Sequence, residues 1–191
     1  MSNKKVAFFD RDGVINVNHG YVHQIADFEF MDGIIELMLH VQASGYELVV
    51  VTNQSGIARG MYTEDQFTQL NQWMCAQLLE QGVVITDTYY CPHHPTAGNS
   101  ALTQDCACRK PKPGMLLTAA QKHGYDLSQS IMVGDNRSDM QCAINAHLRA
   151  GYWLTNKPQD IAALTQLSDT VAENSTQVLQ INTLRDCLHL I

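Results

Sequence analysis

The sequence predicts an α/β fold, a single Rossmann-like domain in which helices flank a mostly parallel sheet. Short apolar runs, rich in β-branched and aromatic residues, alternate along the chain with segments of helical periodicity. One of these runs, residues 48–51, is continuously apolar, which is typical of a strand buried on both faces of a parallel sheet. The 191 residues suffice for one compact domain with a sizeable core, so we expect a single domain over residues 1–191.

The first half of the chain begins with an apolar strand at residues 6–10. Apolar side chains then recur at helical spacing over residues 34–41. The second strand is expected at residues 46–52, where the chain is again apolar. A second helix follows, because Thr63 and Gln66 form the sequence pattern of a capping box ahead of an amphipathic segment.

The second half continues the alternation of strand and helix. Its expected elements are a strand at residues 83–90, helices at 114–123 and 138–146, and strands at 130–134 and 150–154. Toward the end of the chain, we expect a short strand beginning at Val171 and a closing helix at residues 177–188. Active sites of parallel sheets lie beyond the carboxyl ends of the strands, so the residues that follow each strand are the candidates for a site.

Composition excludes several classes of protein. Hydrophobic residues make up 45% of the chain, which is ordinary for a globular protein and excludes a disordered one. The 12 basic and 19 acidic residues give a net charge of −7, which argues against nucleic-acid binding. The first residues lack the apolar run of a signal peptide, and no stretch approaches the length of a membrane span. We therefore expect a cytoplasmic monomer that binds neither nucleic acid nor membrane and keeps its six cysteines reduced.

Polar and charged residues follow the predicted strands. Asp10 and Asp12 end the first strand two residues apart, so both carboxylates can face one crevice. Thr52 ends the second strand, Asp135 follows the fourth, and Lys110 precedes a helix. Asp10 and Asp135 can share a hard cation such as Mg²⁺, while Thr52 and Lys110 can hold phosphoryl oxygens as charge develops on them. The pattern predicts a phosphoryl-transfer site with a carboxylate nucleophile.

These residues resemble the four motifs of the haloacid dehalogenase superfamily of phosphohydrolases. The motif residues are Phe9-Asp10-Arg11-Asp12-Gly13-Val14, Thr52-Asn53, Lys110, and Gly134-Asp135 with Asp139. The resemblance implies that Asp10 is the nucleophile and that Asp12 is the general acid and then the base. It also implies that Mg²⁺ is bound by Asp10, Asp135 and the main-chain carbonyl of Asp12.

The loop of about residues 91–110 contains a second cluster of potential ligands. These are three thiols and one imidazole: Cys91, His93, Cys106 and Cys108. In a reducing compartment such soft ligands suit Zn²⁺, and four protein ligands leave no open position, so we expect a structural zinc site. The zinc would fix Arg109 and Lys110, which directly follow the last ligand.

Other interpretations of this loop remain open at the level of the sequence. His94 is an alternative to His93 as the imidazole ligand, although the spacing from Cys91 favours His93. The cysteines could also be unrelated reduced thiols, or Cys106 and Cys108 could form a redox pair.

Within the superfamily, the loop resembles two related families, the heptose-bisphosphate phosphatases of lipopolysaccharide-core synthesis and the histidinol-phosphate phosphatases. Residues 18–23 and 52–60 resemble the heptose family. The resemblance implies the following substrate contacts: Asn18, His19, Gly20, Tyr21, Asn53, Gln54, Ser55, Arg109 and Lys110. Asn136 departs from the family pattern, because many members have a basic residue there.

The resemblance therefore implies a Mg²⁺-dependent phosphatase that removes the 7-phosphate of a heptose 1,7-bisphosphate, a small phosphorylated sugar, through an aspartyl-phosphate. A histidinol-phosphate phosphatase is the alternative enzyme. A phospho-accepting, receiver-like signalling domain is an alternative of another class, but its acceptor aspartate usually ends a middle strand. A zinc-loop binding module is a third interpretation.

Overall fold

The computed structural model describes residues 4–98, 101–157 and 176–191. Its sheet has six strands, all parallel, in the order β3-β2-β1-β4-β5-β6. The strands are β1 (Lys5–Phe9), β2 (Tyr46–Asn53), β3 (Ile85–Cys91), β4 (Ile131–Gly134), β5 (Ala150–Leu154) and β6 (Gln177–Ile181). The predicted α/β fold with a parallel sheet is confirmed. The strand order runs outward in both directions from the neighbours β1 and β4, which makes this pair the topological switch point.

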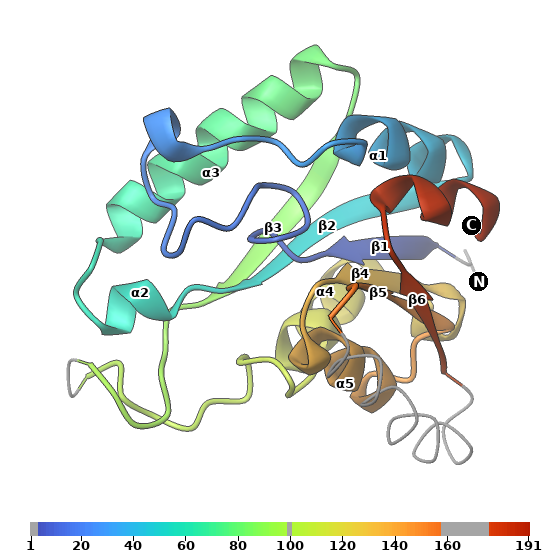
Figure 1. Ribbon diagram of the computed structural model, residues 1–191. Helices are drawn as coiled ribbons and strands as arrows, with labels where there is room; N and C mark the ends of the chain where they lie inside the picture. The colour runs from blue at the N-terminus through green and yellow to red at the C-terminus, as the bar shows by residue number, and fades with distance from the viewer. Residues whose placement is uncertain (1–3, 99–100, 158–175) are drawn as a thin grey trace.

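Helices cover both faces of the sheet (Figure 1). Helices α1 (Ile34–Ala43) and α3 (Glu64–Glu80) pack on one face, and α4 (Gly114–His123) and α5 (Arg137–Asn145) pack on the other. The shorter segments are α2 (Ser55–Ala58) and the 3₁₀ helices η1 (Ile25–Asp27), η2 (Leu127–Gln129) and η3 (Leu184–His189). The predicted capping box is present at the start of α3. The side chain of Thr63 accepts a hydrogen bond from the main-chain N–H of Gln66, and the side chain of Gln66 accepts one from the main-chain N–H of Thr63.

The core forms two layers separated by the sheet, because successive side chains of β1 point to opposite faces. Ala7 and Phe9 pack with α1 and α3, whereas Val6 and Phe8 pack with α4 and α5. All four side chains are fully buried. A shift of one residue in the pairing of β1 would move each of these side chains to the other face of the sheet, so their burial fixes the register of β1. This register places Asp10 at the carboxyl end of the strand.

The prediction of a helix over residues 177–188 is wrong. Residues Gln177–Ile181 form β6 alongside β5, and only Leu184–His189 are helical. Val178, Ile181 and Leu184 recur at a spacing that suits a helix. However, β5 offers unpaired backbone groups at its edge, and pairing with them determines the strand.

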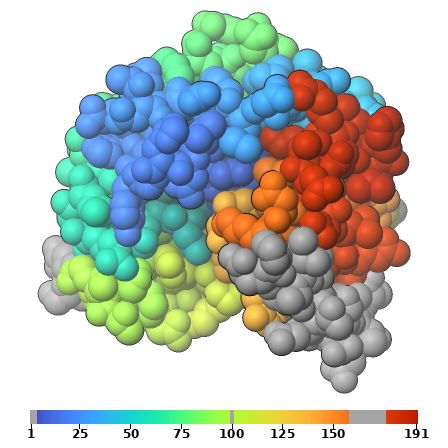
Figure 2. Space-filling model, in the orientation of Figure 1, coloured from blue at the N-terminus to red at the C-terminus, as the bar shows by residue number. Residues whose placement is uncertain are grey.

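The end of the chain is attached to the first helix. Arg185 of η3 forms ion pairs with Asp32 and Glu36 at the start of α1. In Figure 2 the C-terminal segment, shown in red, lies against the light blue surface around α1. The strand expected from Val171 lies outside the described residues. None of the helices in the described part of the chain combines the length and apolar character that crossing a bilayer requires.

Candidate active site

The predicted catalytic residues meet at the carboxyl edge of the sheet. Asp10 directly follows β1, Thr52 lies near the end of β2, and Asp135 directly follows β4. Lys110 comes from the loop between β3 and α4. Asp10, Thr52 and Lys110 line one cavity of about 250 Å³. Because β1 and β4 are neighbours at the switch point, Asp10 and Asp135 lie close together.

The ammonium group of Lys110 is buried among oxygen atoms. Its Nζ lies 2.9 Å from Asp10 Oδ1 and 2.7 Å from Asp139 Oδ1. It also donates a hydrogen bond of 2.9 Å to the main-chain carbonyl of Val51. Burial alone would lower the pKa of Lys110, but the two carboxylates outweigh it and raise this pKa above its ordinary value. The lysine therefore supplies a fixed positive charge beside Asp10.

Asp10, Asp135 and Asp139 form a carboxylate cluster in which one oxygen of each lies within 4.8 Å of the others. Burial raises the pKa of Asp10 well above its usual value, although Lys110 acts in the opposite direction. Burial likewise raises the pKa of Asp135 to about 6. Three carboxylates beside one ammonium group leave two negative charges uncompensated when all are ionised. A divalent cation that prefers oxygen ligands, such as Mg²⁺, fits both this charge and these donors.

Gly13 makes room for Asp135. The φ angle of Gly13 is +94°, a conformation that residues with side chains rarely adopt, and a Cβ here would collide with the Asp135 carboxylate. Two further contacts hold Asp135 in place. Asn136 Nδ2 donates to its Oδ1 at 2.7 Å, and Trp153 Nε1 donates to its main-chain carbonyl at 3.1 Å. Asn136, the residue that departs from the family pattern, thus contacts the acid that precedes it.

The carboxylate of Asp12 accepts hydrogen bonds from three side chains. Arg11 donates through Nε to Oδ2 (3.1 Å) and through Nη2 to Oδ1 (2.9 Å). Gln54 Nε2 donates to Oδ2 at 2.9 Å, and Asn16 Nδ2 donates to Oδ1 at 3.3 Å. Asp12 lines the same cavity as Asp10, but it is not part of the carboxylate cluster. This arrangement suits an acid–base residue better than a side-chain metal ligand.

A second cavity of about 250 Å³ adjoins the first, since Asp12, Asn18 and Asn53 line both. The predicted substrate contacts in the first cavity are Asn18, Asn53, Arg109 and Lys110. Those in the second are Asn18, Gly20, Tyr21, Asn53, Gln54 and Ser55. The remaining predicted contact, His19, lines neither of them; it lies 3.8 Å from Glu29 and borders a third cavity of about 480 Å³.

Two predicted substrate contacts are engaged with the protein itself. Asn53 exchanges two hydrogen bonds of 3.1 Å with the main chain of Lys110. Gln54 is only 1% exposed, and its amide group bonds to Asp12 and Thr52. Asn53 therefore fixes the position of Lys110 across the loop, whatever it offers to a ligand.

Ser138 and Tyr62 line these cavities and were not predicted as site residues. Ser138 borders the first cavity and lies in the first turn of α5, between Asp135 and Asp139 of the last motif. Its place in that motif was a usable signal. Tyr62 borders the second cavity and comes from the connection between α2 and α3, where no motif marks it.

The thiols and the imidazole of the loop form a second cluster: Cys91, His93, Cys106 and Cys108. Cys106 Sγ lies 3.4 Å from Cys91 Sγ and 3.3 Å from Cys108 Sγ. His93 Nδ1 lies 3.8 Å from Cys91 Sγ and 3.5 Å from Cys108 Sγ. Around a tetrahedral zinc with Zn–S bonds of about 2.3 Å, sulfur atoms lie about 3.8 Å apart. The donor set and its spacing therefore fit Zn²⁺.

His93, rather than His94, belongs to this cluster. The Nδ1 atom of His94 accepts hydrogen bonds from the main-chain N–H groups of Thr96 and Ala97, at 3.2 and 2.9 Å. Its Nε2 lies 3.0 Å from Nη2 of Arg59. Both ring nitrogens of His94 are thus engaged outside the cluster.

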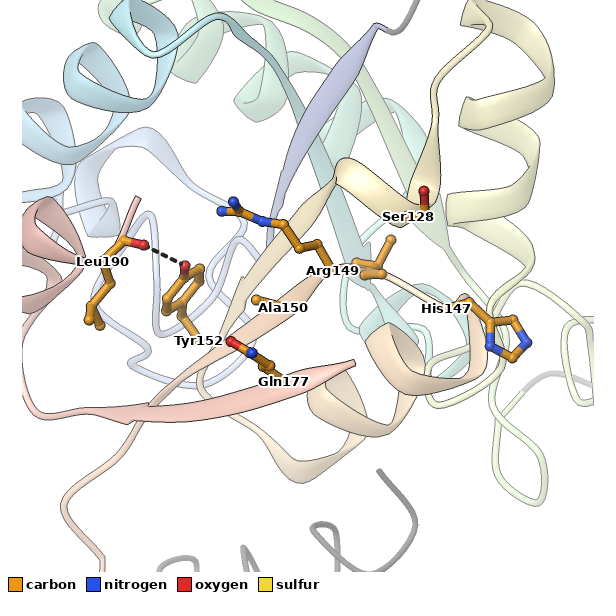
Figure 3. A pocket seen from close by; sticks show the side chains of 8 residues that line it. Ser128, His147, Arg149, Ala150, Tyr152, Gln177 and Leu190 are labelled. Carbon is orange, nitrogen blue, oxygen red and sulfur yellow. Dashed lines mark hydrogen bonds between the residues drawn. The ribbon is translucent and has the colours of Figure 1, made fainter. Parts of the chain in front are cut away.

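The amino-terminal edge of the sheet has a cavity with a different set of side chains. A cavity of about 340 Å³ lies there, beside the starts of β5 and β6, and its lining includes Arg149, Tyr152 and Gln177 (Figure 3). Tyr152 donates a hydrogen bond of 3.2 Å to the main-chain carbonyl of Leu190. The described residues that line this cavity include no carboxylate and no thiol. The carboxyl edge therefore holds the candidate site.

Comparisons with known proteins add to this geometry. Residues 107–178 match the model of a family described as HAD-hydrolase-like. The D-glycero-beta-D-manno-heptose-1,7-bisphosphate 7-phosphatase of Photorhabdus laumondii is 52% identical over 141 residues, covering 74% of this chain and 75% of that protein. The protein of the same name from Escherichia coli K12 is 48% identical over 170 residues, covering 85% and 89%.

Among solved structures, the fold is similar to that of the D,D-heptose 1,7-bisphosphate phosphatase from B. bronchiseptica, complexed with magnesium and phosphate. The TM-score is 0.75 at 27% sequence identity, and the match covers 97% of each chain.

Proposed function

Because this chain belongs to the D-glycero-β-D-manno-heptose-1,7-bisphosphate 7-phosphatase family of the haloacid dehalogenase superfamily, we propose that it removes the 7-phosphate from that sugar bisphosphate. The observation that carries the proposal is the Asp10–Lys110 ion pair of 2.9 Å beside Asp135, in a chain about half identical to those phosphatases. We further propose one domain over residues 1–191, acting as a monomer in the cytoplasm, the compartment in which the thiols stay reduced.

Asp10 is the proposed nucleophile. One of its oxygens forms a bond to the 7-phosphorus while the bond from phosphorus to the sugar oxygen breaks, and Asp12 gives a proton to that departing oxygen. Asp12 then takes a proton from the water that attacks the aspartyl-phosphate, which releases inorganic phosphate and restores Asp10. Lys110 and Thr52 hold the phosphoryl oxygens as negative charge builds on them.

The two proposed metal ions have separate roles. Asp10, Asp135 and the main-chain carbonyl of Asp12 would hold Mg²⁺, which supplies positive charge to the transferring phosphoryl group. Cys91, His93, Cys106 and Cys108 would hold Zn²⁺, which closes the loop that presents Arg109 and Lys110. The carboxylates and the thiols form two distinct clusters of matching donor chemistry, and this supports both assignments.

The two adjoining cavities support a polar substrate of sugar size. The first is lined by Asp10, Lys110 and Arg109, which suits a phosphate group at the reacting end. The second is lined by Tyr21, Ser55 and other polar groups, which can pair with sugar hydroxyls. Histidinol phosphate would instead need partners for an amine and an imidazole, and the family relationship does not favour it.

The experiment that tests this function compares two substrates. We expect the kcat/KM for the β-anomer of the heptose 1,7-bisphosphate to exceed that for histidinol phosphate by at least about 100-fold, or roughly 2.7 kcal/mol in transition-state binding. Phosphorus NMR of the product is expected to show that the 1-phosphate remains. A preference for histidinol phosphate, or loss of the 1-phosphate, would reject the proposal.

A further inference from the structure

The hydrogen bonds of Gln54 indicate a role other than contact with the sugar. We propose that Gln54 and Tyr62 are positioning residues that hold Asp12 for proton transfer to the leaving group. This inference rests on the proposed role of Asp12 as the general acid. It assigns a function to Tyr62, which no motif marks, and it changes the role expected of Gln54.

Both N–H groups of the Gln54 amide donate hydrogen bonds to other side chains of the protein. Its Nε2 donates to Asp12 Oδ2 at 2.9 Å and to Thr52 Oγ1 at 2.7 Å. Its Oε1 accepts a hydrogen bond of 2.5 Å from the hydroxyl of Tyr62. The residue is 1% exposed, so a substrate has almost no access to it. The amide joins two residues that line the first cavity, Asp12 and Thr52.

Asp12 and Tyr62 hold the Gln54 amide from its two ends. Because the phenol donates to Oε1, the amide nitrogen is turned toward Asp12, whereas the reverse orientation would place Oε1 against a carboxylate. The Tyr62 ring is itself held from two sides. Gly56 packs so closely against the ring that a Cβ would collide with it, and the His23 ring stacks on it at 5.1 Å with an interplanar angle of 8°.

These contacts act on the carboxylate oxygens of Asp12 and on the hydroxyl group of Thr52. Oδ2 of Asp12 accepts hydrogen bonds from Gln54 (2.9 Å) and from Arg11 Nε (3.1 Å). Oδ1 accepts from Arg11 Nη2 (2.9 Å) and from Asn16 (3.3 Å). Gln54 is therefore one of the three side chains that fix the orientation of the Asp12 carboxylate. Thr52 accepts a hydrogen bond from Gln54, which leaves its own hydroxyl hydrogen free to point to a phosphoryl oxygen.

A correctly positioned general acid accelerates cleavage most when the leaving group is a strong base that departs slowly without a proton. The alkoxide of a sugar leaves slowly without a proton, and general acid catalysis of this kind is typically worth about 10²–10⁴-fold. The p-nitrophenolate ion leaves readily as the anion. Loss of positioning should therefore slow cleavage of the sugar phosphate more than cleavage of p-nitrophenyl phosphate, with phenyl phosphate between them.

The test measures kcat/KM for these three substrates in the Mg²⁺- and Zn²⁺-loaded protein carrying Gln54→Met or Tyr62→Phe. This constant reports only the steps up to cleavage of the phosphate ester, so the later action of Asp12 as a base does not enter. For Gln54→Met, we expect the ratio of the heptose bisphosphate to p-nitrophenyl phosphate to fall by at least about tenfold. The ratio of phenyl to p-nitrophenyl phosphate should fall as well. Tyr62→Phe should lower both ratios as well, but by a smaller factor than Gln54→Met.

Asn18→Ala is the matched control, because Asn18 lines both cavities and has no hydrogen bond to Asp12 among the described contacts. It should lower kcat/KM most for the sugar, and it should leave the ratio of phenyl to p-nitrophenyl phosphate at the wild-type value. If Gln54→Met behaves like this control, or lowers all three constants equally, the inference is wrong. If Gln54→Met does not fold, Tyr62→Phe decides by the same ratios. A wild-type protein inactive on all three phosphates would instead reject the proposed function.

Discussion

Arg109 and His93 are joined by a hydrogen bond of 3.1 Å, which the arginine donates through Nη1 to the main-chain carbonyl of the histidine. His93 also contributes the imidazole of the thiol cluster. Arg109, which lines the first cavity of the candidate active site, is therefore held by a residue of the proposed zinc site. The same loop packs against α4 so closely that a Cβ on Gly114 would collide with the Ala107 carbonyl. The conformation of this loop thus determines the position of Arg109 in the candidate active site.

Replacing one thiol of the cluster should weaken both the fold and substrate binding. Serine is a poor zinc ligand, so Cys108→Ser should release zinc and loosen the loop that holds Arg109. We expect the melting temperature to fall by roughly 5 °C or more and KM to rise more than kcat falls. Elemental analysis, thermal unfolding and steady-state kinetics measure these effects.

Cys75→Ser is the matched control, because Cys75 is a half-buried free thiol outside the cluster. It should keep about one zinc per chain and the wild-type KM. A Cys108→Ser protein that kept its zinc, melting temperature and KM would contradict the structural role of the cluster.

Gly13→Ala should weaken Mg²⁺ binding and lower activity by displacing Asp135. The added Cβ would collide with the Asp135 carboxylate, and the φ of +94° adds a backbone penalty of more than about 1 kcal/mol. Gly124→Ala separates the two effects. Gly124 also has a positive φ, +75°, but among the described residues no atom beyond its local backbone and chain neighbours lies within 4 Å of its Cβ position. Both variants should be less stable, while only Gly13→Ala should require much more Mg²⁺ for half-maximal activity. Equal Mg²⁺ requirements would refute this account of Gly13.

Stability should depend on Asp87 in a defined range of pH. Burial alone would raise the pKa of Asp87, but hydrogen bonds from Lys122 (2.8 Å) and His123 (3.0 Å) outweigh it and lower the pKa to about 2, from an ordinary value of 3.8. Because the folded-state pKa is the lower one, Asp87 stabilises the fold above about pH 4, and this contribution is lost as the pH falls to about 2.

The measurement is the melting temperature of Asp87→Asn and of the wild type from about pH 6 to pH 2. The difference between them should be present at pH 6 and shrink toward zero at pH 2. Asp65→Asn, a change to an exposed carboxylate of α3, is the control for removing a carboxylate that lacks these hydrogen bonds. A difference for Asp87→Asn that stayed constant with pH would disprove this role.

The two aspartates of the first motif should differ in kinetic effect. Asp10→Asn removes the attacking oxygen, so turnover should fall by many orders of magnitude in a protein that remains folded. Asp12→Asn removes proton transfer, and the loss should be about 10²–10⁴-fold. Steady-state kinetics with the heptose bisphosphate compares them. Wild-type turnover by Asp10→Asn would exclude the covalent mechanism.

Much of the fold follows from local patterns in the sequence. Helix α4 (Gly114–His123) has the predicted bounds, because Gly124 adopts the left-handed conformation that ends it. Residues 177–181 could not be assigned from periodicity, since their apolar positions fit a helix and a strand alike. The edge of β5 decides between the two, and that edge exists only in the folded sheet.

The candidate site was predictable where a motif follows a strand, as for Asp10, Thr52 and Asp135. The hydrogen bond from Tyr62 to Gln54 was not, because it depends on how the chain between α2 and α3 packs against the end of β2. Gln54 was predicted to contact the substrate, and only its burial and its partners indicate a different role.

The most direct test of the mechanism is to trap phosphate on the protein. The Asp12→Asn protein would be mixed with p-nitrophenyl phosphate and Mg²⁺, quenched in acid, digested and analysed by mass spectrometry. This leaving group does not need an acid, while loss of the base slows hydrolysis of the intermediate. We predict a phosphorylated peptide with the modification on Asp10, absent when Asp10→Asn is added. Release of p-nitrophenol over a full turnover with no phosphate on Asp10 at any time would contradict the account.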